Sequence, residues 1–331
     1  MELRKLFFVF LLVVYISNED LIARSMLRQR REYQRRPQNS ATQGNMVELN
    51  LSYDLSMPGE TSRINFVVIL PETIPGRQNI LSIRYSPKPT RIFNKNGNRY
   101  AEFLFIKPDK QEKVKINIRA ELLRYDLLTA REQAGKDRYE YTGLRDFLKH
   151  EKNIEKDHAE IQQIAESING QTQIDIVKKI YNYVIDNLKY TTHNGKDWSA
   201  VKALQWKKGD CTEYSDLFVA LCRAKKIPAR FAAGYTVRFD NISPKHNWAE
   251  VFLQDYGWVP FDPSWGDVGN FILRDRAFSR MMPVYMYLTH IRNDEVLNNY
   301  QFAGYKYWGD RAKVTDSIEF KIISSTFPKT R

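Results

Sequence analysis

One of the two cysteines in this chain of 331 residues stands where a reactive thiol would be useful. The segment Gly209-Asp210-Cys211 precedes an apolar stripe of helical period, which predicts a helix beginning at Cys211. Unpaired backbone N–H groups at a helix start favour the thiolate form of a cysteine, and they can also hold an oxyanion. Cys211 is therefore a candidate nucleophile.

The second cysteine, Cys222, lies eleven residues further along the same predicted stripe. A continuous helix separates the two Cα atoms by about 16 Å, whereas a disulfide requires less than about 7 Å. We therefore expect no disulfide between Cys211 and Cys222, and we expect Cys222 to be buried.

A cysteine nucleophile needs a base, and the base needs an orienting group. His246 begins a predicted strand, and Asp262 follows the strand that returns after a short turn. If the turn holds three residues, Leu253 faces Gly257, and His246 and Asp262 become diagonal neighbours on one face, about 7–8 Å apart at Cα. A slip of one residue would send Asp262 to the opposite face. The spacing thus predicts a histidine–carboxylate pair.

Three motifs carry these residues, and together they resemble the bacterial transglutaminase-like family over roughly residues 145–270. They are Gly209-Asp210-Cys211-Thr212-Glu213-Tyr214-Ser215, His246-Asn247-Trp248-Ala249-Glu250-Val251 and Phe261-Asp262-Pro263-Ser264-Trp265. The resemblance implies a papain-like core with Cys211 as nucleophile, His246 as base and Asp262 as the orienting carboxylate. The family also places an aromatic donor at the oxyanion site, and Tyr190 is the candidate for that role.

Other carboxylates near these motifs have alternative interpretations. Glu213 and Asp216 lie on the cysteine helix, and a carboxylate in the first turn is most simply a partner of the helix dipole. Glu250, four residues after His246, competes with Asp262 as the orienting group.

The elements that must position these groups follow two different periods. From Val47 the apolar residues alternate with polar ones, and short runs separated by turn residues continue to about residue 122, which predicts a small antiparallel β-sandwich. Apolar positions between Ile174 and Leu188 follow a helical period. The expected fold class is therefore α+β: a transglutaminase-like catalytic core at 123–310, preceded by a β-sandwich at 47–122 and followed by a C-terminal strand and tail at 311–331.

The N-terminal segment has the pattern of a targeting sequence. Arg4 and Lys5 precede an unbroken apolar run of eleven residues, 6–16, which as a helix rises about 16 Å, half the thickness of a hydrocarbon core. Residues 1–23 are therefore predicted to be a signal peptide or, alternatively, an uncleaved anchor. Residues 24–46 are basic and polar and predict a flexible linker. We expect the protein to be extracytoplasmic, with membrane contact only through an uncleaved N-terminus.

Charge and histidine spacing bear on partners and cofactors. The chain has 51 basic and 39 acidic residues, a net charge of +12, of which the first 36 residues carry +4. The remaining +8 is ordinary for solubility and predicts no nucleic-acid partner. The histidines outside the motifs, His150, His158, His193 and His290, have no metal-ligand spacing. We expect no metal and no organic cofactor.

The resemblance implies a cysteine hydrolase or acyltransferase that acts on peptide or carboxamide bonds through an acyl-thioester. Water is always available as the acceptor, so a peptidase or amidase is favoured over protein crosslinking. The expected partner is a peptide or protein substrate, which includes cell-envelope polymers. The alternative is a non-catalytic envelope binding protein that retains the fold.

Overall fold

The computed structural model describes residues 44–127, 130, 143–193, 198–237 and 244–325. The predicted signal peptide or anchor at 1–23, and all of the predicted linker except 44–46, lie outside the described residues. Within these ranges, no helix combines the length and the apolar character needed to span a bilayer.

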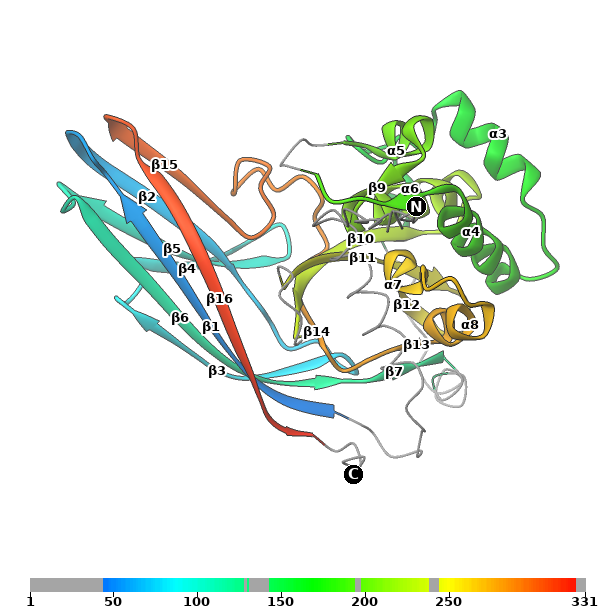
Figure 1. The fold of residues 1–331 in the computed structure, drawn as a ribbon, viewed down its shortest axis with the longest axis horizontal. Helices are drawn as coiled ribbons and strands as arrows, with labels where there is room; N and C mark the ends of the chain where they lie inside the picture. Colours follow the sequence, from blue (N-terminus) through cyan, green and yellow to red (C-terminus); the bar gives the residue numbers. More distant parts are fainter. Residues whose placement is uncertain (1–43, 128–129, 131–142, 194–197, 238–243, 326–331) are drawn as a thin grey trace, which may run out of the picture.

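Two four-stranded antiparallel sheets form the part of the molecule at the left of Figure 1. The first sheet has the order β16-β1-β6-β3, and the second has the order β15-β2-β5-β4. Their strands are β1 (Gly44–Ser56), β2 (Thr61–Leu70), β3 (Gln78–Ser86), β4 (Arg91–Lys95), β5 (Asn98–Ile106), β6 (Gln111–Leu123), β15 (Ala303–Gly309) and β16 (Lys313–Ser325).

The strands form because apolar residues recur at every second position. In β1, Val47, Leu49 and Leu51 are buried, while the residues between them are partly or fully exposed. The inward residues of both sheets join one hydrophobic cluster that contains Phe66 of β2 and Ile116 of β6. We refer to these eight strands as the two-sheet module.

The C-terminal strands of the module lie far from the others in sequence. β15 pairs with β2, and β16 pairs with β1 over nearly its whole length. The predicted boundaries grouped residues 303–309 with the catalytic core, whereas the structure pairs them with β2. Without β15 and β16, the ladder edges of β2 and β1 would be unpaired, which gives the physical reason for this difference.

The rest of the described chain combines helices with a third sheet of order β12-β11-β10-β14, so the chain mixes helix and sheet as predicted. The helices are α3 (Ala159–Ser167), α4 (Gln173–Asn187), α5 (Ala200–Trp206), α6 (Cys211–Ala224), α7 (Pro263–Gly266) and α8 (Phe271–Ser279), with a 3₁₀ turn at Leu144–Leu148. The strands are β10 (Ala229–Thr236), β11 (Lys245–Leu253), β12 (Gly257–Phe261) and β14 (Tyr285–Thr289), with the two-residue strands β7 (Tyr125–Asp126), β8 (Lys189–Tyr190), β9 (Lys208–Gly209) and β13 (Arg280–Met281). We refer to this part as the helical core; α6 packs against β11 on one side and against α3, α4 and α5 on others.

Strand β14 joins the helical core to the two-sheet module. Its residues alternate: Tyr285 and Tyr287 belong to the hydrophobic cluster of the helical core, whereas Met286 and Leu288 belong to that of the two-sheet module. The side chain of Gln78, fully buried on β3, accepts from the Tyr287 N–H at 2.7 Å and donates to the Tyr287 carbonyl at 3.0 Å. The position of β14 is therefore fixed from both sides.

Candidate active site

The helix that carries Cys211 has a capped N-terminus. Asp210 is the N-cap and accepts from the Thr212 N–H at 2.7 Å, while the Glu213 side chain accepts from the Asp210 N–H at 2.9 Å. This reciprocal pattern is a capping box. It makes the helix begin at Cys211, as predicted, and places the thiol beside the first backbone N–H groups. Cys222 is fully buried on the same helix, and both cysteines are free thiols.

The electrostatic environment of Cys211 differs from what a helix start alone would give. Burial and the negative charge of Asp210 raise the pKa of the Cys211 thiol well above its ordinary value, and Asp262 and Glu213 raise it further. A hydrogen bond from the backbone of Asn247 acts in the opposite direction. Desolvation and the nearby carboxylates outweigh this hydrogen bond, and they favour the protonated form of the thiol.

The pairing of β11 with β12 follows the register expected from the spacing. Leu253 faces Gly257, and Ala249 faces Phe261. His246 lies at the start of β11 and Asp262 directly after β12, so both side chains reach the same place. The His246 Nε2 atom lies 2.6 Å from Asp262 Oδ2, and the two residues are 2% and 3% exposed.

Asp262 is held by four hydrogen bonds to its carboxylate. The Oδ1 atom accepts from the Trp265 N–H at 2.8 Å and from the Ser264 hydroxyl at 2.7 Å, because Asp262 is also the N-cap of α7. The Oδ2 atom accepts from the Tyr285 hydroxyl at 2.7 Å in addition to its contact with His246. These bonds fix the orientation of both oxygens.

The backbone of Asp262 is bound as well. The Tyr181 hydroxyl of α4 donates to the Asp262 carbonyl at 3.0 Å. A Cβ atom added at Gly266 would lie 1.9 Å from the same Tyr181 hydroxyl, so only glycine leaves room for this contact. The turn that carries Asp262 is thereby packed tightly on α4.

A side-chain bridge connects the cysteine helix to the histidine strand. Asn247 follows His246 on β11, and its amide donates to the hydroxyl of Thr212, which follows Cys211, at 2.7 Å. Together with the backbone contact between Asn247 and the thiol, this bridge holds the start of α6 against the start of β11. The cysteine, histidine and aspartate segments thus meet at one end of the helical core.

Tyr190 lies near this meeting point through a short parallel pair of strands. It is the second residue of β8 and faces Gly209 of β9, two residues before Cys211. The Thr191 N–H donates to the Gly209 carbonyl at 2.9 Å, and the Tyr190 ring is 6.0 Å from that of Tyr214. The half-buried Tyr190 is therefore fixed beside the start of α6.

The competing carboxylates are occupied elsewhere. Glu250 binds Arg230 at 2.6 Å and His290 at 3.0 Å, and Arg77 lies at 3.6 Å. Burial alone would raise the pKa of Glu250, but these positive partners hold it well below its ordinary range. Asp216 is fully buried and accepts from the Arg292 guanidinium at 3.0 and 3.1 Å. Each carboxylate thus has a structural partner.

Glu213 belongs to a compact group with His193 and Asp210. The His193 Nε2 atom lies 2.9 Å from Glu213 Oε2 and 3.5 Å from Asp210 Oδ2. Within the described residues this is the set of side chains that could hold a metal ion, although spacing along the chain did not indicate one. Glu213 Oε2 already accepts the capping N–H and contacts His193, so a hydrogen-bonded capping network accounts for the arrangement.

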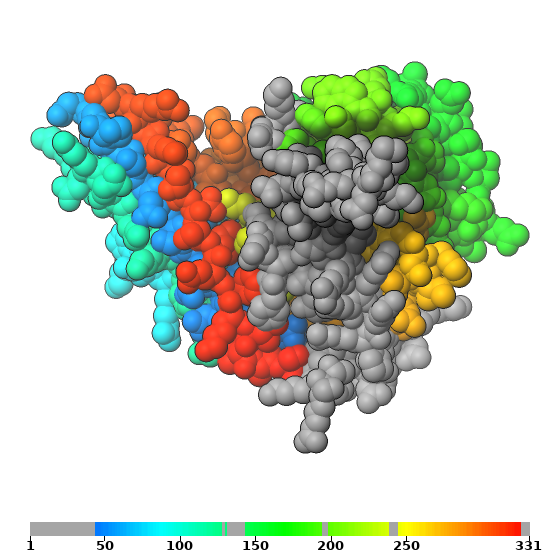
Figure 2. Space-filling view, in the orientation of Figure 1, coloured from blue at the N-terminus to red at the C-terminus, as the bar shows by residue number. Residues whose placement is uncertain are grey.

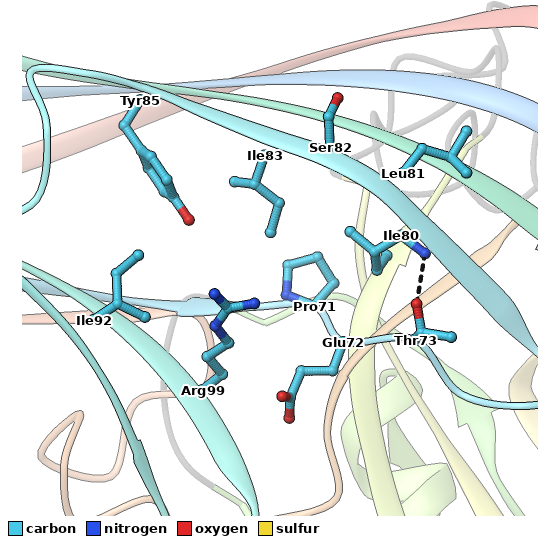
Figure 3. Close-up of a pocket in the computed structure, with 10 residues that line it drawn as sticks. All are labelled: Pro71, Glu72, Thr73, Ile80, Leu81, Ser82, Ile83, Tyr85, Ile92 and Arg99. Atoms are coloured by element: carbon cyan, nitrogen blue, oxygen red, sulfur yellow. Dashed lines mark hydrogen bonds between the residues drawn. The ribbon is translucent and has the colours of Figure 1, made fainter.

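A pocket of about 360 Å³ lies elsewhere, in the two-sheet module (Figure 3). It opens between β3 and β4, the edge strands of the two sheets, and Ile80, Ile92 and Arg99 are among its lining residues. None of the residues that line this pocket belongs to the cysteine, histidine or aspartate motif. It is a gap between sheet edges and forms no part of the candidate active site.

Sequence reasoning missed two residues of the site. Asn247 directly follows His246, and an amide next to the predicted base could have been interpreted as another residue of the site. Tyr285 is 23 positions beyond Asp262 and lies outside the three motifs. No local pattern marks it, because its contact depends on how β14 pairs with β10.

A family model matches the segment of the helical core that carries the candidate site. The model of the transglutaminase-like superfamily matches residues 162–263, which confirms the resemblance. The matched range includes Cys211, His246 and Asp262.

Two further matches add to the comparison. The uncharacterized protein YebA of Bacillus subtilis (strain 168) is 30% identical over 112 residues, which represent 28% of this chain and only 15% of YebA. A solved structure from Cytophaga hutchinsonii, described as a "putative cysteine protease", is 17% identical, covers 87% of this chain and 93% of that chain, and has a TM-score of 0.59. At this identity the likeness is one of fold, and it extends beyond the helical core.

Proposed function

We propose that this protein is a cysteine hydrolase or acyltransferase acting on peptide or carboxamide bonds, with Cys211 as nucleophile, His246 as base and Asp262 as orienting carboxylate. The observation that carries the proposal is the buried His246–Asp262 contact of 2.6 Å. Asn247, the neighbour of His246, holds this pair close to the start of the helix that bears Cys211. A structural histidine would not require a carboxylate fixed by three further hydrogen bonds.

The reaction follows from these positions. Asp262 binds Nε2 of His246, so Nδ1 is the imidazole nitrogen that accepts the Cys211 proton. The sulfur then forms a bond to the substrate carbonyl carbon, and the C–N bond breaks as His246 returns the proton to the departing amine. An acyl-thioester remains on Cys211. Water, activated by the same imidazole, hydrolyses this thioester and restores the free thiol.

The oxyanion formed during attack needs donors. We assign this role to the first N–H groups of α6, because the helix begins at Cys211. We assign the Tyr190 hydroxyl as an additional donor, because β8 fixes this residue beside Gly209. The raised pKa of Cys211 means that the thiolate forms only as His246 takes the proton, and the base is therefore essential at neutral pH.

Hydrolysis is favoured over crosslinking as the outcome, because water reaches an acyl-thioester more readily than a protein amine does. The proposed substrates are peptides or proteins, including polymers of the cell envelope. The apolar run at 6–16 supports an extracytoplasmic location, in which the N-terminus is a signal peptide or an anchor.

The direct test is incubation of the purified protein with candidate envelope peptides, with and without a primary amine, followed by mass spectrometry. Scission, deamidation and amine incorporation give three distinct mass changes. Cys211→Ala should abolish all of them, whereas Cys222→Ala should leave them in place. Turnover that survives in Cys211→Ala would contradict the proposal, and tight peptide binding without any turnover would favour the alternative of a non-catalytic binding protein.

A further inference from the structure

Two groups share one carboxylate oxygen at the centre of the proposed site. Asp262 Oδ2 lies 2.6 Å from His246 Nε2 and 2.7 Å from the hydroxyl of Tyr285. All three residues are almost fully buried, with 2%, 3% and 4% of their surface exposed for His246, Asp262 and Tyr285. Water therefore has little access to this oxygen, and the tyrosine competes directly with the imidazole for its negative charge.

We propose that Tyr285 is a positioning residue of the Cys211–His246–Asp262 triad, which withdraws negative charge from Asp262 and which the two-sheet module holds in place through β14. The proposal rests on the proposed function for its effect on turnover, although the interaction itself is measurable without a substrate.

The direction of the effect follows from the shared oxygen. A hydrogen bond to a carboxylate stabilises its charge and reduces its attraction for a second partner. With Tyr285 in place, Asp262 therefore stabilises the imidazolium form of His246 less than a carboxylate without Tyr285 would. Loss of the hydroxyl should raise the pKa of His246, so that the imidazole stays protonated to higher pH and is less available as a base at neutral pH.

Other titratable groups near His246 and Asp262 come from the elements that pack around them. From α6 come the Cys211 thiol and the carboxylates of Asp210 and Glu213, which act on that thiol. The neighbour of His246 on its own strand, Lys245, is bound to Asp316 of β16 at 2.8 Å. From α4, Tyr181 binds the Asp262 carbonyl, and β14 contributes Tyr285. A Tyr285 substitution changes only the last of these groups.

The two-sheet module explains why Tyr285 stays at this oxygen. Gln78 of β3 binds both backbone groups of Tyr287, two residues along β14. Met286, between the two tyrosines, is fully buried in the cluster of the two-sheet module. The Asn45 amide of β1 also donates to the Pro283 carbonyl at 2.8 Å, just before β14. The module is thereby a support for the triad, which gives it a role that the sequence did not indicate.

The test is an NMR titration of ¹³C-labelled histidine, with the His246 signal assigned by its loss in His246→Ala. Tyr285→Phe should raise the pKa of His246 by about half a unit or more. The matched control is Tyr287→Phe, which removes the same atom from the same strand at a ring that packs 4.7 Å from Trp248. This control should leave the titration of His246 unchanged.

A second variant protects against loss of folding in Tyr285→Phe. Site-specific incorporation of 3-fluorotyrosine at position 285 keeps the size of the ring and makes the hydroxyl a stronger donor, so the pKa of His246 should move downward. Opposite shifts in the two variants support the proposal. If both variants fold and His246 titrates as in the wild type in each, the proposal is overturned.

Turnover adds the functional readout. With a peptide cleaved in a Cys211-dependent manner, the acid limb of the plot of kcat/KM against pH should shift to higher pH in Tyr285→Phe. It should stay at the same pH in Tyr287→Phe. A uniform loss of rate without a shift of this limb would mean that Tyr285 is only structural, and would contradict the proposal. If no Cys211-dependent turnover exists at all, the proposed function fails, while the NMR titration still decides whether Tyr285 acts on Asp262 and His246.

Discussion

Glu213 shows how one buried side chain can make the stability of this fold depend on pH. It is 1% exposed, caps α6 and contacts His193. Burial and the neighbouring negative charge of Asp210 raise its pKa from 4.5 to about 8. Between these values the unfolded chain ionises at this position while the folded protein does not, so the free energy of unfolding falls as the pH rises.

Glu213→Gln should therefore flatten this dependence. In the wild type, the free energy of unfolding should fall by more than about 1 kcal/mol between pH 5 and pH 8 because of this group, and the variant should lose that part of the decline. Urea unfolding at several pH values measures it. The matched control is Glu166→Gln, at an exposed position of α3, which should follow the wild type. An identical decline in both variants would contradict the raised pKa.

Tyr190 can be tested as an oxyanion donor at the same scale. Removal of such a donor weakens the transition state more than the bound substrate, so Tyr190→Phe should lower kcat by about tenfold to a hundredfold with little change in KM. The control is Tyr183→Phe, a half-buried tyrosine of α4. An unchanged kcat in Tyr190→Phe would remove Tyr190 from the mechanism, and the α6 backbone would then be the proposed donor.

At the scale of elements, one edge of β14 is hydrogen-bonded at Tyr287 by the side chain of Gln78. Gln78 occupies both the N–H and the carbonyl of Tyr287, which are buried. Gln78→Met keeps the size of the side chain but leaves these two groups without their partner. We expect a loss of about 2–4 kcal/mol in the free energy of unfolding.

The same change at an exposed glutamine provides the comparison. Gln111 of β6 is exposed and donates to the Ser56 hydroxyl at 3.0 Å. Gln111→Met should alter the free energy of unfolding by no more than about 0.5 kcal/mol. If chemical denaturation gives equal losses for the two methionine variants, Gln78 does not hold β14.

The elements also show which parts of the site the sequence could predict. The contact between His246 and Asp262 was predictable because both residues flank one hairpin, whose loop length sets the register. The start of α6 was predictable because Asp210 and Glu213 form a local capping signal. The contact of Tyr285 was not predictable, since it requires β14 to pair with β10, where Tyr285 faces Thr236, 49 positions earlier, and the register shifts after Ala233. The raised pKa of Cys211 also depends on burial, which local pattern does not report.

At the scale of the whole molecule, the helical core and the two-sheet module are joined by buried contacts as well as by the chain. Met286 and Leu288 complete the cluster of the two-sheet module, and Arg77, directly before β3, donates to the Trp258 carbonyl of β12 at 2.6 Å. The predicted division at residue 123 therefore separates segments that depend on one another for burial. Sequence pattern identified both kinds of structure, but it could not show that strands at 303–325 return to the first sheets.

This dependence predicts that the intact protein unfolds in a single thermal transition. Five tryptophans lie between Trp198 and Trp265 in the helical core, while Trp308 lies on β15, so fluorescence of variants that retain only Trp308 reports on the two-sheet module. The midpoint for Trp308 should coincide with that from far-ultraviolet circular dichroism of the same variant. Two separated transitions in calorimetry of the wild type would contradict the interdependence of the two parts.

The central claim is that His246 activates the thiol of Cys211, and the rate of Cys211 alkylation by iodoacetamide as a function of pH tests it most directly. Because burial and nearby carboxylates keep the thiol protonated, we predict that the wild type reacts at neutral pH in a step that follows the titration of His246. We predict that His246→Ala loses this step and reacts only at alkaline pH, whereas His158→Ala, at an exposed histidine, keeps it. Identical profiles for the wild type and His246→Ala would contradict the account.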